Sequence, residues 1–86
     1  MKRFKLELYV GILKVLAHNG PLKLTHITNK TNINSVILKE YLGFLIKQGL
    51  IEEPTTKDAR VIYVVTQRGI NVLKYFREIA QELPII

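Results

Sequence analysis

The fold of this protein is decided by residues 25–66, which read THITNKTNINSVILKEYLGFLIKQGLIEEPTTKDARVIYVVT. Apolar residues recur there at helical spacing and are followed by runs rich in β-branched residues. The pattern predicts a short helix, a turn at Asn32-Ile33-Asn34, a longer helix ending near Gln48-Gly49, and a β-hairpin closed by Val64-Val65-Thr66. In that order, these elements form the predicted framework of the fold.

The longer helix carries the clearest signals. We expect it over residues 34–48, with Asn34 or Ser35 as the N-cap, because short polar side chains accept hydrogen bonds from the first backbone N–H groups. A projection at about 100° per residue separates two faces. The core face carries Leu38, Tyr41, Leu42 and Leu45. The opposite face, called the presented face below, carries Val36, Lys39, Glu40, Gly43 and Lys47.

Elements also precede this stretch. A first helix is expected from about Arg3 to His18, because Gly20 suits the left-handed position beyond a helix end and Pro21 prevents continuation. Residues 22–23 would form a short strand, and the second helix would cover about residues 25–30. The first part of the chain therefore predicts a helix, a short strand and a second helix.

The hairpin and the last helix complete the prediction. Strands are expected at residues 50–53 and 61–65, joined by a loop over residues 54–60. Thr66 would cap a last helix over residues 67–82. The fold class is therefore mainly α with a small β-hairpin, an α+β arrangement.

Length and charge narrow the possible roles. A chain of 86 residues, of which 48% are apolar, suffices for one compact domain, taken here as residues 1–86. The net charge is +6, and its excess lies in residues 1–50, where eight Lys and Arg residues face only Glu7 and Glu40. A basic protein is drawn to polyanions such as nucleic acid or anionic membrane surfaces. The charge supports a nucleic-acid partner without deciding it.

Several function classes find no support in the sequence. There is no cysteine, so no disulfide or thiolate chemistry is expected, and a reducing cytoplasmic setting fits. The longest apolar run, Leu8 to Leu13, is too short to span a bilayer, and no cleavage site for a signal peptide follows it. His18 and His26 lack acidic partners at metal-ligand spacing, and no phosphate-binding loop or nucleophile motif occurs. We expect no enzyme, metal, cofactor or small-molecule ligand.

The first helix is apolar around most of its surface. Its apolar residues cover an arc of about 240°, against about 100° for an ordinary surface helix, and the last helix also carries a wide apolar band. Because large exposed apolar patches usually mark an interface, we expect a homodimer through residues 1–19 and 67–83. The expected interface residues are Phe4, Leu8, Val15, Val72, Phe76, Ile79 and Leu83. The alternative is a monomer in which the first helix is simply central.

Several short motifs carry a family resemblance: Thr25-His26-Ile27, Asn32-Ile33-Asn34, Leu38-Lys39-Glu40-Tyr41-Leu42, Leu45, Gly49-Leu50-Ile51 and Tyr63-Val64-Val65-Thr66-Gln67-Arg68-Gly69. With these motifs and the order of its elements, which is the outline of a winged helix-turn-helix, nearly the whole chain resembles the small archaeal winged-helix DNA-binding proteins. These include the Sulfolobus ten-kilodalton chromatin-type group and related transcriptional regulators. The resemblance implies dimers that bind duplex DNA, with the third helix in the major groove, the wing near the backbone and the C-terminal helices paired. The last helix is short for the long coiled coil of the chromatin-type group.

The resemblance implies a DNA-binding surface on the presented face and around it. Base edges would be met by Ser35, Val36, Lys39, Glu40 and Gly43, and phosphates by Lys23, His26, Lys30 and Lys47, with Asn34 also part of the DNA-binding surface. Lys57 and Arg60 of the loop would grip the backbone or enter the minor groove. Val36 and Ile37 either contact thymine methyl groups or lie at the edge of the core, and Glu40 repels phosphates unless it reads a cytosine amino group.

The sequence therefore predicts a dimeric protein that binds double-stranded DNA, acts as a transcriptional regulator and is associated with the nucleoid in the cytoplasm. Two alternatives stay open. One is a winged-helix module that binds other proteins, and the other is an architectural chromatin protein that binds DNA without sequence preference.

Overall fold

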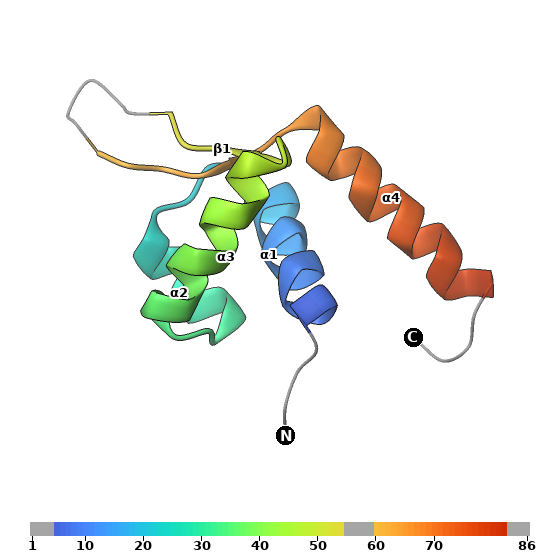
Figure 1. The fold of residues 1–86 in the computed structure, drawn as a ribbon, viewed down its shortest axis with the longest axis horizontal. Helices are drawn as coiled ribbons and strands as arrows, with labels where there is room; N and C mark the ends of the chain where they lie inside the picture. The colour runs from blue at the N-terminus through green and yellow to red at the C-terminus, as the bar shows by residue number, and fades with distance from the viewer. Residues whose placement is uncertain (1–4, 55–59, 83–86) are drawn as a thin grey trace.

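The computed structural model describes residues 5–54 and 60–82. Its elements, in chain order, are α1 (Lys5–Asn19), α2 (Leu24–Thr31), α3 (Ser35–Lys47), β1 (Ile51–Glu52), β2 (Val64–Val65) and α4 (Gln67–Glu82). Helices α1 to α3 form the body, the hairpin lies at one end, and α4 leads away from the body (Figure 1). The fold class predicted from the sequence is confirmed, and the predicted bounds of α4 match the observed ones.

Local hydrogen bonds define the turn between α2 and α3. Asn32 adopts the left-handed conformation with φ of 61°, and its backbone N–H donates to the carbonyl of Thr28. The side-chain oxygen of Asn34 then accepts from the backbone N–H of Val36 at 2.8 Å, which confirms Asn34 as the N-cap of α3. Between them Ile33 is buried. The turn is therefore closed by a backbone cap at Asn32 and a side-chain cap at Asn34, and is anchored by one apolar side chain.

The hairpin is shorter than predicted. Its two strands pair antiparallel, with Ile51 opposite Val65 and Glu52 opposite Val64, so the predicted bounds of 50–53 and 61–65 were too wide. Leu50 belongs to the turn after α3, because its backbone N–H donates to the carbonyl of Leu45. Pro54, on the other side, has no N–H to donate to a strand ladder.

The strand predicted at residues 22–23 is an isolated bridge. Leu22 and Tyr63 exchange two backbone hydrogen bonds, at 3.1 and 2.8 Å, but no second pair extends the bridge into a named strand. Lys23 instead occupies the N-cap position of α2. The second helix starts one residue earlier than predicted, at Leu24, and ends one residue later, at Thr31.

The core lies where α1, α2, α3 and β1 meet. Its fully buried side chains are Ile12, Leu13, Leu16, Ile27, Leu38, Leu42, Leu45 and Ile51. The predicted core face of α3 is confirmed, since its three leucines are buried and Tyr41 is half-buried. Burial of such side chains contributes about 1.5 to 3 kcal/mol each to the free energy of unfolding.

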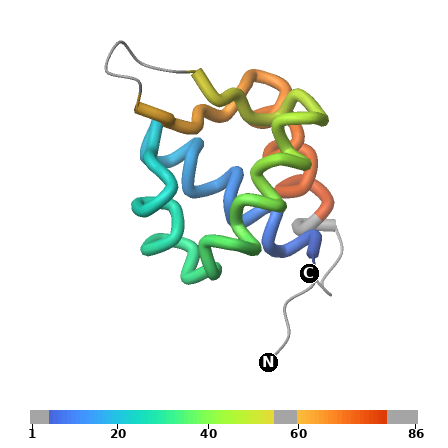
Figure 2. The backbone as a smooth tube through the Cα atoms, turned by 60° about the vertical axis from the view of Figure 1, so that its left-hand side comes forward, coloured from blue at the N-terminus to red at the C-terminus, as the bar shows by residue number. Residues whose placement is uncertain are grey.

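Helix α1 runs through the middle of the molecule, between α2 and α4 (Figure 2), and also contacts β2. Residues on several sides of it therefore pack against the core, including the half-buried Leu8, Tyr9 and Val10. Part of its wide apolar arc is explained by this central position within one chain. Leu6, however, is 54% exposed. Within the described ranges, no helix is both long and apolar enough to cross a bilayer.

Candidate nucleic-acid interface

The presented face of α3 is open to solvent. Val36, Lys39, Glu40, Gly43 and Lys47 are all exposed, on the side of the helix opposite the buried leucines. Four of them, at spacings of four, three and four residues, form a nearly straight row: Val36, Glu40, Gly43 and Lys47. The row is about 16 Å long at about 1.5 Å per residue. An α-helix with such a face fits the major groove of B-DNA, which is about 12 Å wide.

Because Gly43 has no side chain, nothing projects from the helix surface at the middle of this row. A Cβ atom built on Gly43 would meet nothing within 4 Å, so packing within the domain does not require glycine there. The helix backbone is therefore accessible at this point. A flat surface such as a base-pair edge can approach the backbone at Gly43 more closely than elsewhere along the row.

Exposed lysines also lie just before α2 and on it, and α2 packs against α3. Lys23 precedes α2, and its carbonyl accepts from the N–H groups of His26 and Ile27, both at 3.1 Å. His26 and Lys30 are one helical turn apart on α2, so they share a face, and all three candidate phosphate contacts on this segment are exposed. The three residues predicted to contact phosphates, Lys23, His26 and Lys30, are thus accessible to solvent in the structure.

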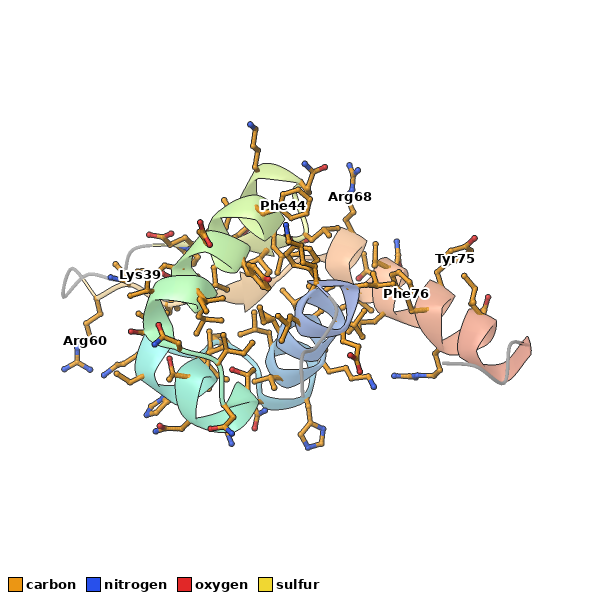
Figure 3. All side chains as sticks on the ribbon, turned by 60° about the horizontal axis from the view of Figure 1, so that its bottom comes forward. Lys39, Phe44, Arg60, Arg68, Tyr75 and Phe76 are labelled. Carbon is orange, nitrogen blue, oxygen red and sulfur yellow. The ribbon has the colours of Figure 1, made fainter. Side chains whose placement is uncertain are left out.

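The hairpin brings another cation to the same end of the molecule. Arg60 is exposed, and Figure 3 shows Arg60 and Lys39 at the end remote from α4. Lys57 lies outside the described residues, so the prediction for it stands as made. Ser35 is exposed, whereas the side-chain oxygen of Asn34 is engaged in capping α3. Asn34 can still offer its amide N–H groups to a ligand.

An aromatic cluster on α1 and α3 was not predicted. The ring of Tyr9 lies 4.9 Å from the ring of Tyr41 and 4.9 Å from that of Phe44, centroid to centroid. Phe44 is 45% exposed, so the cluster reaches the surface on one flank of the presented face. The spacing of Tyr41 and Phe44 places them together on α3, but only the tertiary structure brings Tyr9 beside them.

The residues predicted for the dimer interface that the structure describes are neither fully buried nor fully exposed in the single chain. Leu8, Val15, Val72, Phe76 and Ile79 are all half-buried in the single chain, and Leu8 and Val72 pack against the core. Phe4 and Leu83 lie outside the described residues. The unpredicted member of this region is Tyr75, which is 62% exposed and meets the Phe76 ring edge-on at 6.3 Å. Among the described residues, no group of three or more His, Asp or Glu side chains could hold a metal ion.

Comparison with known families matches residues 2–83 to a family described as winged helix-turn-helix. No curated protein matches the chain by sequence. Among solved structures, the DNA-binding protein Sso10a-2 from Sulfolobus solfataricus is similar, with 26% identity, a TM-score of 0.79, and coverage of 92% of this chain and 80% of that one. The transcriptional regulator YodB from B. subtilis, in its reduced form, has 26% identity, a TM-score of 0.77, and coverage of 93% and 76%.

A third similar structure is larger. BpsR from Bordetella bronchiseptica, whose DNA binding is regulated by 6-hydroxynicotinic acid, has 16% identity and a TM-score of 0.79. The likeness covers 87% of this chain but only 58% of BpsR. This chain therefore spans less than two thirds of the length of BpsR, and the likeness to it concerns the fold alone.

Proposed function

Because the chain belongs to the winged helix-turn-helix family, we propose that it is a dimeric, double-stranded-DNA-binding regulator of transcription. Helix α3 would enter the major groove with its presented face, and the hairpin loop, residues 54–60, would lie on the backbone or in the minor groove. The observation that carries this proposal is the exposed row on α3, and it is supported by exposed cations before and on the neighbouring α2 and at the hairpin. Such a protein acts at the nucleoid, in the cytoplasm.

The charges around α3 support the proposal. Lys23, Lys30, Lys39 and Lys47 are all exposed, and Glu40 is the one acidic residue between 23 and 47. Lysines at the edge of a groove neutralise phosphates and release counterions, which gives affinity without sequence information. The varied groups of the presented face, apolar, acidic and basic, favour a protein with sequence preference over a purely architectural one.

The dimer is proposed to form through α1 and α4. Helix α4 diverges from α1 toward its C-terminal end (Figure 1), and in the middle of α4 an exposed Tyr75 lies next to half-buried Phe76, with half-buried Ile79 one turn further on. A second copy would cover these side chains by burying apolar area on both chains. A two-fold dimer would also present two α3 helices to one duplex.

A salt titration of DNA binding tests the proposal. The affinity for a labelled mixed-sequence duplex is measured by fluorescence anisotropy at several salt concentrations. We expect the logarithm of the binding constant to fall linearly with the logarithm of salt concentration, with a slope of about −0.9 per phosphate contacted. Lys39→Ala and Lys47→Ala should both weaken binding, and Lys47→Ala, which removes a predicted phosphate contact, should also reduce the steepness of the slope by about one per DNA-bound domain.

Lys14→Ala provides the matched control. Lys14 is an exposed cation on α1, outside the proposed surface, so its removal changes the net charge equally but should leave the slope nearly unchanged. The proposal would be abandoned if the protein bound no duplex at low salt. The second candidate, a protein-binding module, would then be favoured, because the partly exposed ring of Phe44 in the aromatic cluster offers an apolar contact surface.

A further inference from the structure

Val36 is exposed to an unusual degree for an apolar residue. Its exposed fraction of 73% is the largest among the large apolar side chains that the structure describes. Neither the capping of α3 nor the stability of the helix requires valine at this position. The cap uses only the backbone N–H of Val36, which donates to Asn34, and a β-branched residue is a weaker helix former than most. The side chain therefore serves neither the core nor the helix.

The neighbours of Val36 indicate what its side chain faces. It stands in the first turn of α3, in the same row as Glu40 and Gly43. A carboxylate such as that of Glu40 is repelled by phosphates, and Gly43 permits close approach of a surface. This N-terminal part of the row, from Val36 to Gly43, therefore suits the floor of a groove, where base edges lie, better than its phosphate walls. In helix-turn-helix proteins the N-terminal residues of this helix contact base edges.

We propose that Val36 contacts the C5-methyl group of a thymine in the major groove, an inference that rests on the proposed DNA-binding function. The methyl group is the apolar feature that distinguishes thymine there, and apolar side chains are its ordinary partners. Contact between the two removes apolar surface from water on both sides. Val36 thereby makes the protein prefer thymine over uracil and cytosine at one position of its site.

Deoxyuridine substitution tests this contact, because deoxyuridine pairs like thymidine and lacks only the methyl group. A tightly bound duplex is first selected from a random pool, and each thymidine is then replaced in turn. We expect one position, or its symmetric pair, at which deoxyuridine raises the Kd about fourfold per half-site, the equivalent of about 0.8 kcal/mol for one buried methyl group. In Val36→Ala the Kd values of the two duplexes should become nearly equal.

Ile37→Ala is the matched control because, of the two apolar residues that the sequence suggested as thymine contacts, only Val36 lies in the row. Ile37, 44% exposed, lies about 100° around the helix from it. The Ile37→Ala variant should keep the difference between thymidine and deoxyuridine. Restoring the methyl group supplies a second readout: 5-methylcytosine should bind the native protein more tightly than cytosine at the same position, and this gain should vanish in Val36→Ala.

The outcomes separate this inference from the function on which it rests. If no duplex is bound, the proposed function fails and the inference fails with it. If duplexes are bound but no thymidine is sensitive to loss of its methyl group, the inference alone is overturned. It is also overturned if the sensitivity persists in Val36→Ala or disappears in Ile37→Ala. Thermal unfolding of both variants checks that the domain remains intact.

Discussion

At the scale of single residues, two helical glycines stand in opposite surroundings. Gly43 of α3 has open space where a Cβ would lie, whereas Gly69 of α4 is buried. A Cβ on Gly69 would collide with the backbone carbonyl oxygen of Leu50 and would lie 2.6 Å from Cγ2 of Val65. That carbonyl cannot move freely, because it accepts a hydrogen bond from the backbone N–H of Thr66.

Gly43→Ala is expected to separate stability from function. Alanine is the better helix former, and nothing obstructs its Cβ, so the free energy of unfolding should rise by about 0.5 to 1 kcal/mol. The added methyl group would hold base edges away from the helix, so duplex affinity should fall severalfold. Urea unfolding and anisotropy titration measure the two effects. Unchanged affinity would mean that Gly43 does not approach the DNA.

Gly69→Ala is the contrasting substitution and should behave in the opposite way. The Cβ would overpack the junction of α4 with Leu50 and Val65, and such overpacking typically costs about 1 to 3 kcal/mol. The same urea unfolding experiment measures the cost. A stability equal to that of the native protein would show that the junction is loose enough to absorb a methyl group.

Tyr63 links stability to alkaline pH. Burial, and to a lesser extent the negative charge of Glu53, raises the pKa of the Tyr63 phenol above its ordinary value of 10.0. The folded protein therefore keeps the phenol proton to higher pH than the unfolded chain does. Its contribution to stability is complete below about pH 10 and is lost as pH rises through the pKa of the folded state.

Tyr63→Phe should remove this part of the pH dependence. The native protein should lose free energy of unfolding relative to the variant as pH rises above about 10, and the difference between them should be constant at lower pH. Urea unfolding of both proteins between about pH 8 and pH 11 provides the comparison. Parallel curves across that whole range would contradict the assigned pKa shift.

At the scale of elements, Thr66 joins the end of α3 to the start of α4. Its hydroxyl donates to the carbonyl of Gly49 at 2.7 Å and accepts from the backbone N–H of Gly69 at 3.1 Å. Its own backbone N–H donates to Leu50. The predicted cap of α4 is thus confirmed, and the same hydroxyl also binds the turn that follows α3. These hydrogen bonds of Thr66 fix the point at which α4 leaves the body formed by helices α1 to α3.

Thr66→Ala should lower the free energy of unfolding, because it removes the hydroxyl that connects the end of α3 to the start of α4. Loss of a capping hydroxyl costs about 0.5 to 2 kcal/mol, and here the contact with Gly49 is lost as well, so a loss near the upper end is expected. Thr66→Ser keeps the hydroxyl and should recover most of the stability. Thermal unfolding of the three proteins measures this order. Equal losses in both variants would assign the effect to the methyl group instead.

At the scale of the whole molecule, the cations near the proposed DNA-binding surface lie far from the aromatic side chains of α4. Figure 3 shows Lys39 and Arg60 at one end and Tyr75 and Phe76 on α4 toward the other. The separation allows one surface to bind DNA while another pairs with a second copy. Dimer formation would then leave both α3 helices free, and the affinity of the pair for a duplex would exceed that of one domain.

Tyr75→Glu is expected to weaken the proposed dimer. The side chain is 62% exposed in the single chain, so the fold should persist, while a carboxylate buried between two copies lacks a partner and should raise the dimer dissociation constant at least tenfold. Lys74→Glu, at an exposed neighbouring position on another side of α4, is the control. Analytical ultracentrifugation over a range of concentrations tests both. A native protein that sediments as a monomer at tens of micromolar would refute the dimer.

The sequence by itself determined the order of elements, the caps at Asn34 and Thr66 and the core face of α3. These depend on residue spacing and on hydrogen bonds between backbone groups close in the chain, so local chemistry suffices to predict them. The same periodicity identified the presented face, which is the larger part of the candidate site. It overestimated the strands, because strand length depends on a partner that the pattern does not reveal.

The tertiary structure alone decided which distant residues meet. Leu22 bridges to Tyr63, and Tyr9 packs against Tyr41 and Phe44, across separations at which neither periodicity nor turn chemistry carries information. The central position of α1, which accounts for part of its apolar arc, is of the same kind. Such contacts arise from the packing of whole elements around one core, where the shapes of all the side chains act together.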